Sequence, residues 1–175
     1  IIGIVGCGRI GKQVAKKAAL GLDMKVFGYD PVIPADVELE NIERVATIEE
    51  IFEKADFVSL HLPETPQTRK MINKSLLTLM KPTACLINCA RGGIIDEDDL
   101  YEVLSEKKIH GAGVDVLTQE PFDKDDRLLK LDNMIVTPHD AALNVETMNK
   151  MGLDAAQGIY EVLEGLKPSW PVSKF

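Results

Sequence analysis

The chain has 175 residues, which is long enough to bury the core of one large domain. Its net charge of −8 argues against nucleic acid or an anionic membrane as a partner, and no apolar run approaches membrane-spanning length. Three cysteines without C-x-x-C spacing and three scattered histidines predict reduced thiols, a cytoplasmic protein and no metal site.

The sequence opens with an apolar strand and a glycine-rich turn. Residues 1–5 form the strand, Gly6, Gly8 and Gly11 follow at G-x-G-x-x-G spacing, and residues 12–20 are predicted to be a helix. In a dinucleotide-binding turn the first glycine permits the bend, the second lets the backbone approach a pyrophosphate, and the third lets the helix pack on the strand. The free N–H groups at the helix start would then face the phosphates. Alone this is a weak signal, because glycine-rich turns also serve purely structural roles.

The next segment strengthens the dinucleotide interpretation. A second predicted strand, residues 25–29, is followed by Asp30. An acid at this place accepts hydrogen bonds from ribose hydroxyls and repels a 2′-phosphate, so we expect NAD rather than NADP. Pro31 opens a loop where the adenosine would lie. The alternative is a structural turn with a solvated aspartate.

Strands and helices alternate along the rest of the chain, which predicts an α/β fold with a doubly wound parallel sheet, a Rossmann fold, and a ligand crevice at the carboxyl ends of its strands. Further strands are expected at residues 44–46, 56–62, 84–88, 112–116 and 134–137. Further helices are expected at residues 48–54, capped by Thr47, at 73–80, at 97–106, capped by Asp96, and at 143–164.

Three side chains suited to carbonyl chemistry follow predicted strands. The planar fork of Arg91 can hold a carboxylate and a keto oxygen, and His139 can donate a proton to that oxygen as a hydride arrives. Glu120 would stabilise the imidazolium form of His139. Each has a plainer alternative, namely a surface-loop arginine, a structural histidine and a turn residue. We expect His61 to be structural, and Cys89 to line a pocket because no base accompanies it.

Four ordered motifs give the chain a specific resemblance. They are Gly-Cys-Gly-Arg-Ile-Gly at 6–11, Asn-Cys-Ala-Arg-Gly-Gly at 88–93, Gly-Val-Asp-Val at 113–116 with Glu120, and Thr-Pro-His at 137–139. Together they resemble the cofactor-binding domain of the D-isomer-specific 2-hydroxyacid dehydrogenase family over residues 1 to about 172. The second motif also resembles the phosphoglycerate dehydrogenase branch.

The resemblance implies a role for individual residues. Arg91 would orient the substrate, His139 would be the acid/base, and Glu120 would be its partner. The implied cofactor contacts are Arg9 and Ile10 at the pyrophosphate, Asp30, Leu62 and Pro63 at the adenosine, Cys89, Ala90 and Asp115 at the nicotinamide, and also Gly6, Gly8, Gly11, Pro31, Thr68, Arg91, His139, Ala141 and Ala142. One departure is Asp140, which stands where the family usually has an apolar residue.

The resemblance also implies an organisation that this sequence does not contain in full. Residues 1–165 are expected to be the dinucleotide-binding domain, and residues 166–175 a tail that leads back to the substrate domain. The family builds that domain mainly from an N-terminal segment, so we expect the isolated cofactor domain to be inactive.

Two functions stay open from the sequence. The first is an NAD-dependent oxidoreductase that acts, as a homodimer, on a D-2-hydroxy acid or its 2-oxo acid, with phosphoglycerate, glycerate, hydroxypyruvate and lactate all possible. The alternative is an NAD(H)-sensing protein similar to the C-terminal binding protein corepressors, in which cofactor binding controls oligomerisation.

Overall fold

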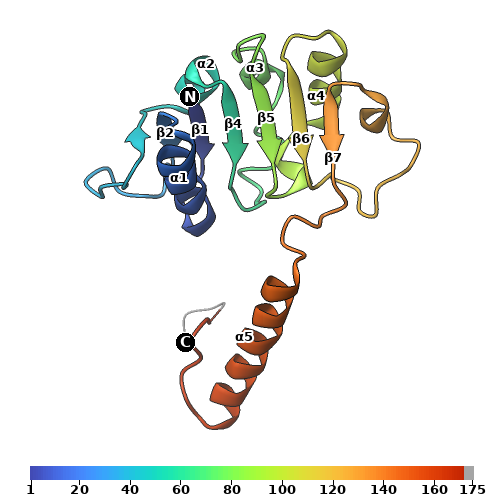
Figure 1. The fold of residues 1–175 in the computed structure, drawn as a ribbon. Coiled ribbons are helices and arrows are strands. Elements are labelled where there is room, and N and C mark those ends of the chain that lie inside the picture. The colour runs from blue at the N-terminus through green and yellow to red at the C-terminus, as the bar shows by residue number, and fades with distance from the viewer. Residues whose placement is uncertain (172–175) are drawn as a thin grey trace. The chain divides into compact units, whose positions relative to one another are not determined.

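A seven-stranded parallel sheet forms the centre of the computed structural model, which describes residues 1–171 (Figure 1). Its strand order is β3-β2-β1-β4-β5-β6-β7, and every neighbouring pair is parallel. The strands are β1 (Ile2–Val5), β2 (Val26–Tyr29), β3 (Glu43–Arg44), β4 (Phe57–Leu60), β5 (Cys85–Asn88), β6 (Gly111–Val114) and β7 (Met134–Val136). The order reverses between β1 and β4, which is the switch point where doubly wound sheets bind ligands. The expected Rossmann fold is therefore confirmed.

The helices occur where the sequence predicts them, with different ends. They are α1 (Arg9–Leu22), α2 (Ile48–Lys54), α3 (Lys74–Leu77), α4 (Glu97–Ser105) and α5 (Val145–Leu163), with short 3-10 turns at Gly92–Ile94 and Leu128–Lys130. Helix α1 begins earlier than expected, directly after Gly8, so the end of the glycine turn is its first turn. The expected helix at 73–80 is a single turn in the structure, and the turn at Leu128–Lys130 was not predicted.

Two expected helix caps are present. The hydroxyl of Thr47 accepts a hydrogen bond from the backbone N–H of Glu50, and the carboxylate of Asp96 accepts from those of Asp98 and Asp99. Each cap satisfies N–H groups that have no partner inside the helix. The acidic residues that follow Asp96 therefore form a favourable first turn of α4.

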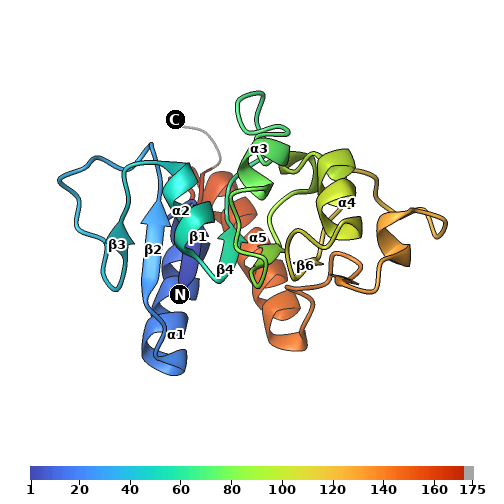
Figure 2. The same ribbon diagram turned by 90° about the horizontal axis from the view of Figure 1, so that it is seen from above.

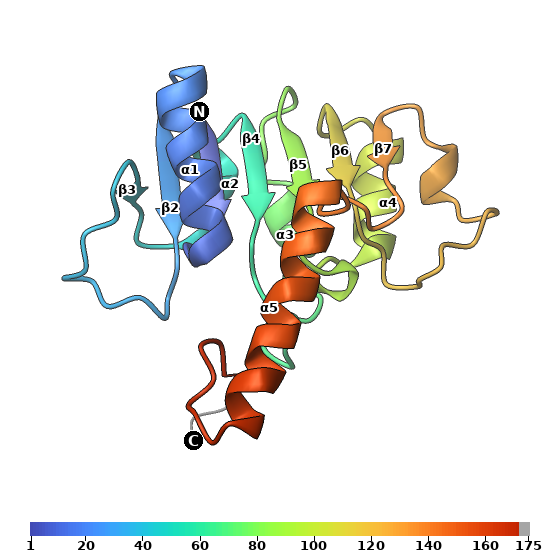
Figure 3. The ribbon, with the colours of Figure 1, turned by 60° about the horizontal axis from the view of Figure 1, so that its bottom comes forward.

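The two faces of the sheet are covered unequally. Helices α2, α3 and α4 lie on one face, where they bury the larger core, and α1 lies on the other face over β1 and β2 (Figures 1 and 2). Side chains alternate between these faces, so Ile4 packs toward α1 and the adjacent Val5 packs into the larger core. The carboxyl ends of all seven strands lie at one edge of the sheet, which is where we look for the site (Figure 3).

The contacts divide the chain into two compact units, Ile1–His139 and the part that begins at Asp140. In the second unit, Glu161 of α5 accepts hydrogen bonds from the amide of Gln157 and from the backbone N–H and hydroxyl of Ser169, which ties the end of the chain to its helix. The boundary expected at residue 165 stays a prediction. None of the helices within residues 1–171 is long and apolar enough to span a membrane.

Candidate functional site: a dinucleotide crevice at the strand ends

The glycine turn after β1 is closely packed at Gly6 and Gly11 and open at Gly8. Gly6 has a φ of +96°, and a Cβ on it would lie 2.6 Å from the carbonyl oxygen of His61. A Cβ on Gly11 would lie 2.1 Å from the carbonyl oxygen of Gly6, so only glycine lets α1 approach the turn. A Cβ on Gly8, in contrast, would meet nothing within 4 Å. The open space at Gly8 faces the helix start and fits the approach of a phosphate.

The N-terminus of α1 has no side-chain cap, which leaves its backbone N–H groups available to an anion. Gly8 occupies the cap position without a side chain, and no acidic residue lies in the first turn. Arg9 and Ile10, the first residues of the helix, are exposed. The first N–H groups of the helix and its positive dipole end are therefore available to a pyrophosphate.

Asp30 is connected directly to this turn. One carboxylate oxygen accepts a hydrogen bond from the backbone N–H of Cys7 at 2.8 Å, and the other accepts from that of Val32 at 2.9 Å. These bonds fix the carboxylate at the end of β2, beside the exposed Pro31. A carboxylate has about four acceptor positions, so this arrangement still leaves capacity for ribose hydroxyls.

The loop after β4 contains three of the implied cofactor contacts. Leu62 lies close to the glycine turn, since a Cβ on Gly6 would be 3.1 Å from it. The hydroxyl of Thr68 donates to the carbonyl oxygen of Pro63 at 2.6 Å and accepts from the N–H of Thr65 at 2.8 Å. Thr68 therefore has a structural part in shaping this loop, and a direct contact with cofactor stays a prediction for all three residues.

Asn88 supports the turn that carries Arg91, and the sequence analysis did not identify it as a site residue. It is fully buried at the end of β5, where its side-chain amide donates to the carbonyl oxygen of Arg91 at 2.9 Å and accepts from the N–H of Ala90 at 3.0 Å. The guanidinium of Arg91 is exposed and donates to the carbonyl oxygen of Ala90. The sequence signal for Asn88 was an amide side chain at the end of an apolar strand, because a buried amide needs hydrogen-bond partners.

The turns after β5 and β6 are in direct contact. A Cβ on Gly92 would lie 2.0 Å from the carbonyl carbon of Leu117. The carboxylate of Glu97 accepts a hydrogen bond from the backbone N–H of Thr118 at 2.6 Å. These contacts hold the segment that leads to Glu120 against the segment that follows Arg91.

A buried carboxylate lies at the end of β6. Asp115 is 3% exposed, and the hydroxyl of Thr137, which follows β7, donates to it at 2.5 Å. Nearby Cys89 is exposed as a residue, but its thiol is partly desolvated. This desolvation, together with the charge of Asp115, raises the pKa of the thiol. A raised thiol pKa opposes nucleophilic chemistry, which agrees with the expectation that Cys89 lines a pocket.

The side chains of His139 and Glu120 contact each other at the same edge of the sheet. Nδ1 of His139 lies 2.7 Å from Oε2 of Glu120, and both side chains are partly exposed. His139 has a φ of +56°, an uncommon conformation for a residue with a side chain. With Nδ1 directed at the carboxylate, Nε2 is the nitrogen that can exchange a proton with a substrate. Ala141 and Ala142 belong to the second unit, so their contacts with a cofactor stay predictions.

His61 has a different environment. It is partly buried next to the glycine turn, and its ring nitrogen Nε2 lies 2.9 Å from the hydroxyl of Ser59. Burial lowers the pKa of His61, which favours the neutral ring. This environment agrees with the structural role that the sequence predicted.

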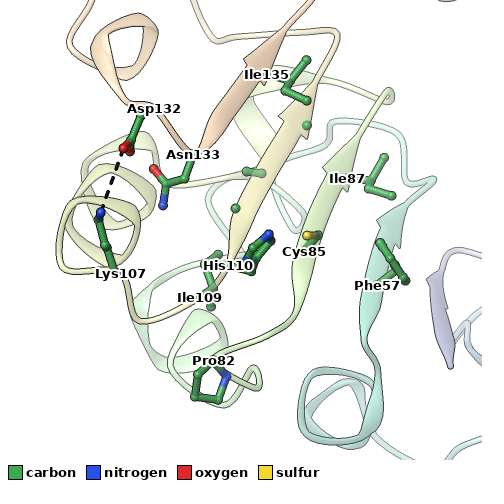
Figure 4. A pocket seen from close by; sticks show the side chains of 13 residues that line it. Phe57, Pro82, Cys85, Ile87, Lys107, Ile109, His110, Asp132, Asn133 and Ile135 are labelled. Carbon is green, nitrogen blue, oxygen red and sulfur yellow. Dashed lines mark ion pairs between the residues drawn. The ribbon is translucent and has the colours of Figure 1, made fainter.

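A hollow of about 680 Å³ lies away from these residues (Figure 4). It lies over one face of the sheet, where Phe57, Cys85 and Gly111 at the strand starts and Ile87, Gly113 and Ile135 further along the strands line it. None of the polar groups described above lines this hollow. We therefore place the dinucleotide crevice at the carboxyl edge and not in the hollow.

Comparison with known proteins supports an NAD-binding domain. Residues 1–141 match the family model of the D-isomer specific 2-hydroxyacid dehydrogenase, NAD binding domain. The chain belongs to this family. Its fold is therefore that of the NAD-binding domain of this family.

Individual relatives of the chain have names that denote different activities. D-3-phosphoglycerate dehydrogenase of Methanocaldococcus jannaschii is 47% identical over 94% of this chain and 31% of its own length. Glyoxylate reductase of Korarchaeum cryptofilum is 42% identical over 95% of this chain and 50% of its own length. The D-mandelate dehydrogenase structure from Rhodotorula graminis has a TM-score of 0.90 at 34% identity and covers 99% of this chain and 51% of that one. The chain thus spans about a third to a half of these relatives.

Proposed function

We propose that the full-length protein is an NAD-dependent dehydrogenase that interconverts a D-2-hydroxy acid and its 2-oxo acid. The observation that carries the proposal is the 2.7 Å pair of Glu120 and His139, which lies at the same sheet edge as the glycine turn. The family membership supports the reaction class.

Each polar residue has a distinct part in this reaction. When bound, NADH supplies the hydride that reduces the carbonyl carbon of the 2-oxo acid. His139 donates a proton from Nε2 to the carbonyl oxygen, and in the reverse direction it accepts the proton of the hydroxyl group. Glu120 stabilises the imidazolium and holds the ring by its Nδ1. Arg91 binds the carboxylate and the carbonyl oxygen of the substrate through its planar guanidinium.

The cofactor-binding residues favour NAD over NADP in this proposal. The glycine turn and the start of α1 would hold the pyrophosphate, and Asp30 would bind the adenosine ribose. Asp30 is already held by backbone N–H groups, so it cannot turn away easily from an added 2′-phosphate. The repulsion between these two anions would weaken NADPH binding.

The substrate is open within the class of 2-oxo acids. Arg91 would recognise only the carboxylate and carbonyl group that these substrates share. The named relatives act on different acids, which is consistent with side-chain specificity that lies outside residues 1–175. A homodimer belongs to the same proposal and is tested by sedimentation of the full-length protein.

The test is NADH oxidation by the full-length protein with a panel of 2-oxo acids, and NADPH is measured in parallel. We expect turnover of at least one acid, with NADH preferred. NADH binding without turnover of any acid would contradict the enzymatic proposal and favour the cofactor-sensing alternative. In that case NADH should change the association state in sedimentation.

A further inference from the structure

The ends of β6 and β7 are linked through two side chains. Asp115 and Thr137 each follow the last residue of their strand, and the N–H of Thr137 donates to the carbonyl oxygen of Val114 at 3.0 Å. This backbone bond extends the pairing of the strands by one residue. It places the hydroxyl of Thr137 2.5 Å from the carboxylate of Asp115.

We propose that Thr137 is a positioning residue for the nicotinamide half of the cofactor. Its hydroxyl holds the carboxylate of Asp115 in the orientation in which that carboxylate accepts a hydrogen bond from the nicotinamide carboxamide. This inference rests on the proposed function and on the place of Asp115 at the nicotinamide, which the family resemblance implies.

The physical argument begins with burial. Asp115 is 3% exposed, and a buried carboxylate is costly unless it is hydrogen-bonded. A hydroxyl that donates to a carboxylate forms one of the stronger, shorter hydrogen bonds in proteins. The bond to Thr137 therefore restricts the orientation of the Asp115 carboxylate at the end of β6.

The position of Thr137 in the chain makes this orientation useful. His139 lies two residues further along, and its backbone N–H donates to the carbonyl oxygen of Thr137 at 3.0 Å. One short segment therefore carries the proposed proton donor and the group that holds Asp115. If His139 and Asp115 are both held in place before the cofactor binds, the site needs less rearrangement on binding.

The adenosine half of the cofactor should not depend on Thr137. The sheet order places four strands between β2, which ends at Asp30, and β7, which ends before Thr137. At about 4.8 Å between neighbouring strands, the two ends are about 24 Å apart. A ligand without a nicotinamide therefore serves as an internal reference.

The experiment compares NAD⁺ with ADP-ribose, which lacks the nicotinamide, by calorimetry on the 175-residue chain. The variants are Thr137→Val, which removes the hydroxyl at nearly constant shape, and Thr137→Ser, which keeps it. Thr78→Val is the matched control, because the hydroxyl of Thr78 donates to the carbonyl oxygen of Lys74 next to α3, far from the crevice. Thermal unfolding of each variant checks that the fold is intact.

We expect Thr137→Val to weaken NAD⁺ binding by about tenfold or more, as for the loss of a hydrogen bond to a charged group. ADP-ribose binding should stay close to that of the parent chain, Thr137→Ser should retain most of the NAD⁺ affinity, and Thr78→Val should change neither ligand. Equal losses for both ligands would show a structural role and overturn the proposal, as would unchanged NAD⁺ binding. A parent chain that binds neither ligand would overturn the cofactor site itself, which is a separate failure.

Discussion

The carboxylate of Glu120 lies 2.7 Å from Nδ1 of His139, although nineteen residues separate them in the sequence. The carboxylate orients the ring and leaves Nε2 as the nitrogen that can transfer a proton. The pair follows β6 and β7, at the edge of the sheet where the strands end.

This geometry predicts a graded loss of activity in the full-length protein. His139→Asn should lower kcat by about 10²–10⁴-fold, because it removes the proposed proton donor. Glu120→Gln should lower kcat by less, because the donor remains but loses its charged partner. Steady-state kinetics with NADH and the preferred 2-oxo acid measures both effects.

The control for these variants is Glu49→Gln, which neutralises an exposed acid in α2 and should leave kcat unchanged. Full activity of His139→Asn would remove His139 from the mechanism. A larger loss for Glu120→Gln than for His139→Asn would contradict the assignment of their roles.

The glycine turn predicts opposite results for two similar substitutions. Gly11→Ala places a Cβ 2.1 Å from the carbonyl oxygen of Gly6, so the free energy of unfolding should fall by about 1–3 kcal/mol. Gly8→Ala meets no protein atom within 4 Å and should leave stability nearly unchanged. It should nevertheless weaken NAD⁺ binding, since the methyl group would occupy the space that we assign to the pyrophosphate.

Urea unfolding and NAD⁺ titration of the two glycine variants test this contrast. Alanine normally favours a helix over glycine by about 1 kcal/mol, so a simple propensity effect would make Gly11→Ala more stable. A more stable Gly11→Ala variant would therefore show that the turn relaxes, and normal NAD⁺ binding by Gly8→Ala would place the pyrophosphate elsewhere.

His61 predicts a pH dependence of stability. Burial lowers its pKa in the folded state, so the unfolded chain binds a proton more readily than the folded one. The contribution of the neutral ring to the free energy of unfolding is fully present above the pKa of the unfolded chain, which is about 6.5. It is lost as the pH falls below that value toward the pKa of the folded state. His61→Gln cannot titrate, so its stability should fall less between pH 7.5 and pH 5.

The measurement for His61 is urea unfolding of the parent chain and of His61→Gln at several pH values. The comparison at pH 8, where the ring is neutral in both states, gives the cost of the substitution itself. Parallel pH curves for the two proteins would contradict the prediction.

The three thiols should react in a definite order. Cys89 is exposed, Cys85 is partly buried and Cys7 is fully buried. Burial raises the pKa of Cys7 to about 11, so very little thiolate is present there at pH 8. A chromogenic disulfide reagent at pH 8 should modify Cys89 first and Cys7 last.

Bound cofactor should affect one of these thiols selectively. If Cys89 lines the nicotinamide pocket, NAD⁺ should slow its reaction, while ADP-ribose should protect it less. Cys89→Ser should remove the fastest phase and identifies it. A fast phase that NAD⁺ does not change would contradict the assignment of Cys89 to the pocket.

The amino-acid sequence by itself determined most elements of the fold and the place of the glycine turn, although it missed the turn at Leu128–Lys130 and extended α3 too far. Short apolar runs predicted the strands, Thr47 and Asp96 predicted two helix starts, and the spacing of Gly6, Gly8 and Gly11 predicted a phosphate-binding turn. These signals are local, because a cap or a tight turn depends on residues a few positions apart. The motif at 137–139, together with the other three motifs, predicted His139 as the acid/base.

The tertiary structure decided how the site residues are supported. The bond of Asp30 to Cys7 and the bond of the Thr137 hydroxyl to Asp115 each join segments whose pairing no local pattern specifies. Such contacts depend on which strands lie side by side and on which face each side chain points to. Parallel pairing brings the ends of distant strands to one edge of the sheet, and only there do these side chains meet.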